Sequence, residues 1–145
     1  EGEASILPGT DGRKMSKSYD NHIPLFLPEN KLKKAVRRIP TDSTPVEEPK
    51  DPDSSFPFQL LTHFADAETT ADVRKRLEAG GMGWGDLKNT LFEVLNAELA
   101  PKRKRYEELM ADPGQIDDIL EANVERARER ARETIHHVRA AIGVG

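Results

Sequence analysis

Apolar side chains recur at intervals of three and four residues along most of this chain, the spacing that places them on one face of an α-helix. Only one short run, Ala4 to Leu7, has the pattern of a strand, and it ends at Pro8-Gly9. One strand of four residues cannot form a sheet by itself. The sequence therefore predicts a mainly α fold of five to six helices behind a short strand and loop.

Three helices are predicted before residue 81, with polar caps or helix-breaking residues at their ends: 29–39, 56–64 and 67–79. Pro40 ends the first helix, because a proline disfavours helical backbone in the residue before it. The second begins after the candidate N-caps Asp53-Ser54-Ser55, and Asp66 caps the third. Gly80 is the expected left-handed stop. Prolines and acidic residues between Thr41 and Asp53 predict an extended linker.

The stretch from Trp84 to Met110 is predicted to be one long helix although it contains Pro101. A proline inside a helix costs about 3 kcal/mol and commonly breaks it. However, the leucines on both sides of Pro101 keep the same helical phase, which a break would have shifted. We therefore expect a single helix, kinked at the proline.

Two further helices are expected at the end of the chain. Asp112-Pro113-Gly114-Gln115 has the composition of an N-cap followed by a capping box, and Asn123 is a plausible left-handed stop. The last helix then runs from Val124 to Gly143. Its outer side carries four potential i, i+3 ion pairs, which indicate a solvated face rather than a binding site: Glu125/Arg128, Arg126/Glu129, Glu129/Arg132 and Arg130/Glu133.

Composition narrows the possible functions. The 145 residues have a formal net charge of −4, so the chain is no general cationic binder of DNA, and any RNA contact must come from a local basic patch. Cysteine is absent, which excludes disulfides, thiolate metal sites and a cysteine nucleophile. The four histidines lack metal-ligand spacing, and we expect no protein-bound metal site. No stretch approaches the roughly 20 apolar residues of a membrane span. We expect a cytoplasmic protein without membrane contact.

The segment Lys14-Met15-Ser16-Lys17-Ser18 is the strongest candidate for a binding site. Two lysines three residues apart, with Ser16 and Ser18 on either side of the second, suit a polyanion, since ammonium groups bind phosphate as mobile point charges. Gly9 and Gly12 allow the backbone to take positive φ and to approach a ligand closely. The alternative for such a segment is a solvated turn.

Residues Gly9 to Ser18, GTDGRKMSKS, resemble the signature loop of class I aminoacyl-tRNA synthetases. Tyrosyl- and tryptophanyl-tRNA synthetases share this loop. Further segments are similar to the tryptophanyl enzymes in their order and spacing: Arg38–Ser43, Lys50–Ser55, Gly83–Lys88, Leu99–Arg103 and Ala127-Arg128. The resemblance extends from about Leu7 to Gly143.

This resemblance implies ATP-dependent activation of tryptophan and its transfer to tRNA(Trp), with Mg²⁺ expected to accompany ATP. It implies that Lys17 is the chief partner of the transition state and that Lys14 supports it. Ser16 and Ser18 would donate to phosphate or cap the turn, Met15 would seat the loop, and Gly12 would let it open and close.

The resemblance also implies two domains. Residues 1–27 would be the end of a Rossmann-type catalytic domain, and 28–145 a helical domain that contacts the tRNA anticodon. The chain contains no His-x-Gly-His, so we expect it to be a C-terminal part that is inactive alone, from a parent that forms a homodimer. Two basic patches are candidates for tRNA contact: Lys33-Lys34-Arg37-Arg38 and Lys102–Arg105. The alternatives are an isolated tRNA-binding or scaffold module and a relative of the tyrosyl enzymes.

Overall fold

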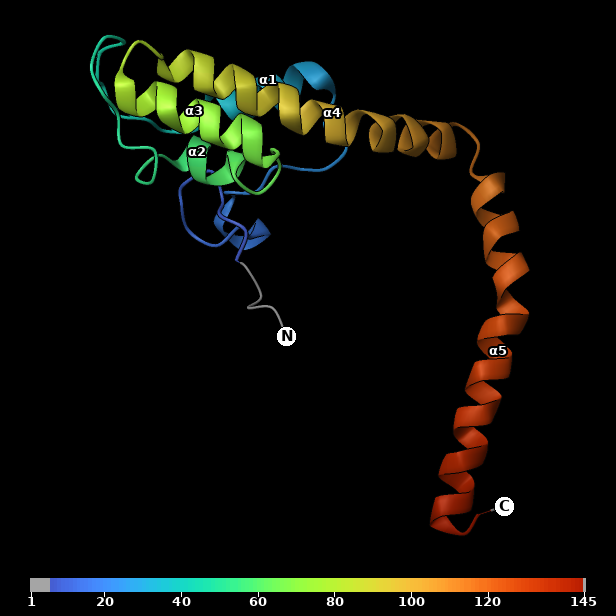
Figure 1. Ribbon diagram of the computed structural model, residues 1–145. Coiled ribbons are helices and arrows are strands. Elements are labelled where there is room, and N and C mark those ends of the chain that lie inside the picture. Colours follow the sequence, from blue (N-terminus) through green and yellow to red (C-terminus); the bar gives the residue numbers. More distant parts are fainter. Residues whose placement is uncertain (1–5, 145) are drawn as a thin grey trace. The chain divides into compact units, whose positions relative to one another are not determined.

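The computed structural model describes residues 6–144, which are mainly helical, as the sequence predicts (Figure 1). Five α-helices and one short 3-10 helix follow one another in these residues: η1 (Lys17–Tyr19), α1 (Glu29–Arg37), α2 (Phe56–Leu61), α3 (Ala67–Ala79), α4 (Trp84–Ala111) and α5 (Gly114–Ile142). Within this described range, the β-pairing is one isolated antiparallel bridge between Pro8 and Lys14. Ile6 and Leu7, the described half of the predicted strand, form no strand; residues 4 and 5 lie outside the described residues.

Side-chain caps begin the short helices where the sequence predicts them. The Ser55 hydroxyl accepts a hydrogen bond from the Phe58 amide at 3.4 Å, and the Asp66 carboxylate accepts one from the Thr69 amide at 2.7 Å. At the end of α3, Gly80 has the expected positive φ of 78°, but its ψ is 169°. Its backbone is therefore not in the predicted left-handed helical conformation. A β-carbon on Gly80 would lie 2.5 Å from the Glu47 carbonyl oxygen, so this close approach of the linker requires glycine.

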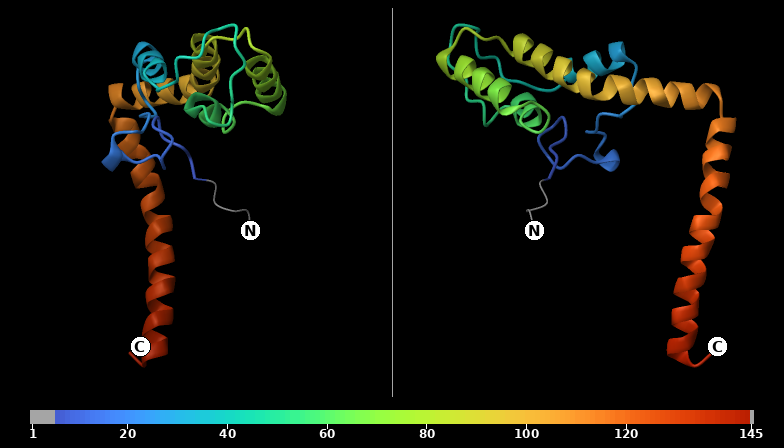
Figure 2. Two further views of the ribbon diagram at one scale, coloured as in Figure 1. Left: turned by 90° about the vertical axis from the view of Figure 1, so that its left-hand side faces the viewer. Right: turned by 45° about the vertical axis from the view of Figure 1, so that its right-hand side comes forward.

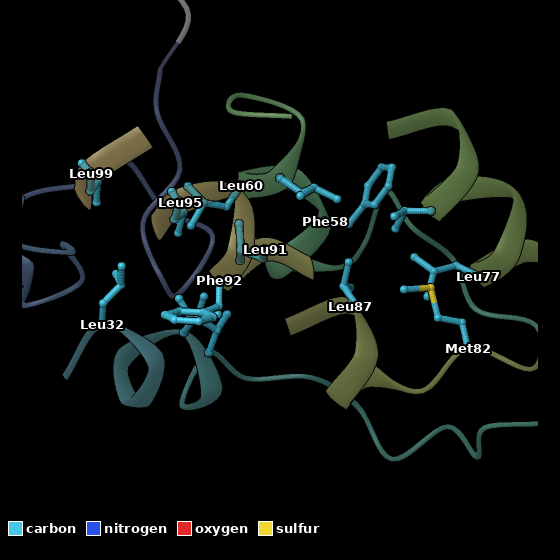
Figure 3. Packing of buried hydrophobic residues seen from close by; sticks show 14 residues of the cluster. Leu32, Phe58, Leu60, Leu77, Met82, Leu87, Leu91, Phe92, Leu95 and Leu99 are labelled. Atoms are coloured by element: carbon cyan, nitrogen blue, oxygen red, sulfur yellow. The ribbon is translucent and has the colours of Figure 1, made fainter. Parts of the chain in front are cut away.

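The chain divides into two compact units, Glu1–Lys104 and Arg105–Gly145, and each is described here by itself. The core of the first unit lies between α1, α2, α3 and the beginning of α4 (Figure 3). Its buried apolar residues come from α1 to α4, from the chain just after α1 and from the turn before α4: Leu32, Val36, Ile39, Phe58, Leu60, Leu61, Val73, Leu77, Met82, Leu87, Leu91, Phe92, Leu95 and Leu99. The segment before α1 also packs on this core, through Leu7, Met15, Ile23 and Leu27.

Helix α4 continues through Pro101, which confirms the prediction of one long helix. Leu87, Leu91, Leu95 and Leu99 form the buried stripe that kept its phase in the sequence. The free energy gained by burying this stripe outweighs the cost of a proline inside the helix, because helices in proteins are stabilised mainly by packing of their apolar face. The kink at Pro101 stays a prediction.

The predicted linker between α1 and α2 has no regular structure, but it is held firmly. Lys50 is only 4% exposed, and its ammonium donates to the carbonyls of Pro45 at 2.6 Å, Glu48 at 2.9 Å and Val46 at 3.3 Å. The Trp84 indole N–H donates to the Asp42 carboxylate at 2.8 Å. A buried ammonium is tolerated here because all three of its N–H donors can reach acceptors.

The second unit corrects two expectations. Helix α5 runs without interruption from Gly114 to Ile142, so Asn123 is not a stop; its side-chain amide instead donates to the Ile119 carbonyl at 2.7 Å. The helix begins at Gly114 without a side-chain cap, although the Gln115 side chain does donate to Asp112 at 3.0 Å. Gly143, with φ 72° and ψ 21°, is the predicted left-handed end.

The charged side of α5 is solvated, as expected. Two of the four predicted ion pairs form among the described residues: Glu125–Arg128 at 2.7 Å and Arg130–Glu133 at 3.2 Å. No residue of α5 is buried, and most apolar side chains of its other face are exposed as well, whereas Val124 is half-buried. None of the helices in residues 6–144 is both long enough and apolar enough to cross a membrane.

Candidate phosphate-binding loop

The segment with the two lysines forms a compact turn before η1. The bridge between Pro8 and Lys14 brings the two ends of the turn together, and the Met15 amide donates to the Leu7 carbonyl at 2.9 Å. Inside the turn, the Gly12 amide donates to the Gly9 carbonyl at 3.1 Å. Gly12 has a φ of 77°, which a residue with a side chain adopts only with strain. Gly12 therefore takes the positive φ that the sequence predicts, whereas Gly9 does not.

Asn21 holds this turn together from the inside. Its side chain is 2% exposed; Oδ1 accepts from the Ser16 amide at 2.7 Å, and Nδ2 donates to Asp11 Oδ1 at 2.7 Å and to the Lys14 carbonyl at 3.1 Å. The Asn21 backbone carbonyl also accepts from the Thr10 amide at 2.9 Å. Nothing in the sequence marks this residue, since a single asparagine in a polar loop has no periodicity.

The predicted site residues take different positions on the turn. Lys14 and Lys17 are both exposed, whereas Met15 between them packs against the core. Ser16 is the N-cap of η1, and its hydroxyl accepts from the Ser18 amide at 3.2 Å. Of the two roles expected for Ser16, the structure therefore shows the capping one. The chain direction reverses after η1 at Asp20, whose φ of 52° is left-handed.

Arg13 is the third cation on the turn, and its charge is paired. Its guanidinium lies 2.6 Å from the Asp11 carboxylate and stacks on the Tyr19 ring, 4.8 Å from the ring centroid. The hydrogen bond from Asn21 lowers the pKa of Asp11 below its ordinary value, and the bonds from Arg13 lower it further. Asp11 therefore stays ionised at neutral pH, and it neutralises Arg13 rather than either lysine.

A pocket of about 390 Å³ opens between the turn and α2. Gly12 and Lys14 contribute to its lining from the turn, and Gln59, Thr62 and His63 contribute from the end of α2. Lys17 is not among the described residues that line it. The two lysines thus belong to one turn but do not enter the same pocket. In both views of Figure 2 the chain before α1, drawn in blue, runs close to α2, which agrees with these contacts.

The two basic patches differ in what they expose. On α1, Lys34, Arg37 and Arg38 are exposed, while the Lys33 ammonium lies 5.1 Å from the Phe92 ring centroid. On α4, Arg103 is only 8% exposed and donates to Asn96 at 3.1 Å, so it belongs to the interior of its unit. Its neighbour Lys102 pairs with Glu98. Lys104 and Arg105 are exposed too, but Arg105 pairs with Glu108. The α1 patch is the stronger candidate for contact with an RNA backbone, because its exposed cations form no ion pair among the described residues.

Groups of three or more histidine or acidic side chains that could hold a metal ion do not occur in residues 6–144. The chemistry that the turn offers is that of cations and backbone donors toward a polyanion. Such groups act on phosphoryl chemistry by positioning and by stabilising charge, without an acid or a base.

Comparison with known proteins gives the same family at each level. Residues 3–100 match the model of the class I tRNA synthetases of the W and Y group. The tryptophan–tRNA ligase of Pseudomonas aeruginosa is 50% identical over 144 residues, 99% of this chain and 32% of the relative. That of Neisseria meningitidis is 47% identical over 139 residues, 96% of this chain and 41% of the relative.

The fold agrees as well. A crystal structure of tryptophanyl-tRNA synthetase from Campylobacter jejuni, complexed with ADP and tryptophan, matches with a TM-score of 0.87 and 38% sequence identity. The match covers 99% of this chain and 45% of that one. The chain thus spans from about a third to less than half of the length of these relatives. Together these matches show that the chain belongs to the class I tRNA synthetases of the tryptophan and tyrosine group, and the relatives named here are tryptophan–tRNA ligases.

Proposed function

We propose that this chain provides the ATP-phosphate-binding loop and the helical part of a tryptophan–tRNA ligase. In this role Lys14 and Lys17 stabilise the triphosphate of ATP while its α-phosphate is attacked by tryptophan. Pyrophosphate leaves, and the tryptophanyl group then passes to tRNA(Trp). Mg²⁺ enters with ATP, as part of the substrate. The parent works in the cytoplasm as a homodimer.

The exposed pair of lysines on an ordered turn is the observation that carries this proposal. Lys14 and Lys17 both face solvent, whereas the other cation of the turn, Arg13, is paired with Asp11. Met15 anchors the backbone between the lysines to the core. The charges are thus left for a ligand, and their backbone is held in place, which is what electrostatic stabilisation of a transition state requires.

Tryptophan is preferred over tyrosine as the amino acid because of the relatives. The matching family model includes both groups, but the relatives that are 42–50% identical over most of this chain are tryptophan–tRNA ligases. The structural match was crystallised with tryptophan and ADP. We propose by analogy that the domain boundary lies near residue 27, with residues 1–27 belonging to the catalytic domain and 28–145 to the helical domain.

A helical tRNA-binding module without catalysis is the second candidate function. The observation that favours it is the α1 patch, where Lys34, Arg37 and Arg38 are exposed on one helix. Lysine and arginine contacts to phosphate supply most of the affinity of sequence-independent binding. In this case the chain alone binds tRNA(Trp), and replacement of all three residues by Gln abolishes that binding.

A chimera tests the main proposal. This chain replaces the matching segment of the Pseudomonas aeruginosa ligase, and tryptophan-dependent exchange of pyrophosphate into ATP is measured. We expect activity with the natural chain. We expect Lys17→Ala to lower the exchange rate about 10–100-fold, the value of a charge-assisted hydrogen bond made mainly in the transition state. The isolated chain should show no exchange. An unchanged rate for Lys17→Ala, with a raised KM for tryptophan, would contradict the proposal.

A further inference from the structure

We infer that Asn21 is the positioning residue of the phosphate-binding loop: its side-chain amide sets the backbone that carries Lys14 and Lys17. The inference rests on the proposed function, since it concerns how the two lysines reach the same polyanion. Asn21 does not touch the ligand in this proposal. It acts through the residues that do.

The position of Asn21 supports this role. Its side chain is almost fully buried, and it bonds at once to Asp11 before Lys14, to the carbonyl of Lys14 itself and to the amide of Ser16 before Lys17. The backbone next to both lysines is thus hydrogen-bonded to the same side-chain amide. Among residues 6–144, no other side chain hydrogen-bonds to both Lys14 and Ser16.

The contact is too close to be incidental packing. A β-carbon on Gly9 would lie 2.4 Å from Asn21 Nδ2 and 2.5 Å from its Cγ, so the backbone of the turn closes directly over the amide. The space admits a glycine and nothing larger. The close approach of Asn21 therefore accounts for the glycine at position 9, where the backbone φ is not positive.

The chemistry of the site requires an amide. The Ser16 N–H needs an acceptor, while the Asp11 carboxylate and the Lys14 carbonyl need donors. Asparagine supplies one acceptor and two donor hydrogens in one planar group. Aspartate has the same shape but no donor, and it would place a second carboxylate beside Asp11 at the present 2.7 Å separation. Asn21→Asp is therefore a nearly isosteric change that reverses two of the three bonds from attraction to repulsion.

A pair of reciprocal variants tests the inference in the chimera. We expect Asn21→Asp to lower the turnover number of pyrophosphate exchange about 10–100-fold, because a displacement of about 1 Å in a catalytic group can cost that much. The KM for tryptophan should stay unchanged. The double variant Asp11→Asn with Asn21→Asp restores a donor opposite an acceptor with the polarity reversed. The double variant should exchange pyrophosphate at least fivefold faster than Asn21→Asp alone. Asp11→Asn alone completes the double-mutant cycle.

Asn89→Asp is the matched control, because it makes the same chemical change at an exposed position on α4. It should leave exchange within twofold of the natural chain. Thermal unfolding of each variant separates a local effect from loss of the fold. We expect the midpoint for Asn21→Asp to stay close to that of Asn89→Asp, since the helical core does not include the turn's amide network.

The outcomes decide between the two proposals. If Lys17→Ala is slow and Asn21→Asp is within twofold of the natural chain, the inference is wrong and the proposed function stands. The inference is also wrong if the double variant is as slow as Asn21→Asp. It is wrong as well if Asn21→Asp lowers the unfolding midpoint and raises the KM for tryptophan by the same factor by which the rate falls. If Lys17→Ala itself is as fast as the natural chain, the proposed function fails first.

Discussion

Gly12 lies directly against the ring of Phe56, so closely that a β-carbon built on Gly12 would be 2.3 Å from Phe56 Cε1. Phe56 is the first residue of α2 and packs against the core of its unit. The candidate phosphate-binding turn therefore rests on a helix that comes more than forty residues later in the chain. The shape of the turn depends on the helical part of the protein and not on its own sequence alone.

The first prediction follows from this contact. Gly12→Ala should displace the turn from α2, because alanine meets the Phe56 ring and is strained at a φ of 77°, at a cost of about 1–3 kcal/mol. We expect pyrophosphate exchange by the chimera to fall at least tenfold. Gly85→Ala is the control, since a β-carbon there meets nothing within 4 Å and alanine favours the helix. A Gly12→Ala variant as active as Gly85→Ala would show that the contact does not matter.

The second prediction concerns the buried ammonium of Lys50. Lys50→Met removes the donor from three carbonyls of the linker, and unsatisfied buried polar groups cost about 1–3 kcal/mol each. We expect the free energy of unfolding in urea to fall by at least about 2 kcal/mol. Lys75→Met on the exposed side of α3 should change it by less than about 0.5 kcal/mol. Equal stability of the two variants would contradict this role for Lys50.

The third prediction tests the core. Leu91 is fully buried in the stripe of α4, and Leu91→Ala should destabilise the first unit by about 2–5 kcal/mol through lost burial and a cavity. Leu120 on α5 is 60% exposed, so Leu120→Ala should cost little. Urea unfolding followed by the fluorescence of Trp84, which packs against this core, is a suitable measurement. Similar midpoints for both variants would argue against the core described here.

The fourth prediction is a dependence on pH. Arg74 lies 2.6 Å from Asp53, and its hydrogen bonds lower the pKa of Asp53 below the ordinary 3.8. A lowered carboxyl pKa stabilises the fold above the unfolded value and loses that contribution as pH falls through the folded value. Asp53→Asn should therefore be less stable than the natural chain at pH 7, and the difference should vanish in acid. In an Arg74→Met background, the same substitution should show no such pH-dependent difference.

The sequence predicted the helices best where the decisive groups are neighbours in the chain. Ser55 and Asp66 cap the helices that follow them, because a cap needs only an amide three residues ahead. The prediction of a helix end at Asn123 was wrong, because local preference allows two states there. Asparagine tolerates a left-handed turn, but its side-chain amide can also donate to the carbonyl four residues earlier and leave the helix intact. Local preference alone does not decide between these two states.

The candidate site was only partly predictable. The lysines, serines and glycines of the turn stand out in the sequence, and Ser16 and Met15 occupy the structural places expected of them. Arg103 continues the four-residue spacing of Leu91, Leu95 and Leu99, so its burial could have been predicted from that stripe. Asn21 and the contact between Gly12 and Phe56 did not stand out, because each depends on contacts between distant or irregular segments. Such contacts are set by the packing of the folded unit and leave no periodic trace.

The amide network around Asn21 also has a consequence for how a ligand binds. A loose turn loses rotational freedom when it closes on a polyanion, and that entropy opposes association. Here the hydrogen bonds to Asp11, Lys14 and Ser16 have already removed much of this freedom from the backbone during folding. What is left to order is mainly the two long lysine side chains. Binding of pyrophosphate should accordingly depend steeply on ionic strength, and a variant with a looser turn should bind it more weakly.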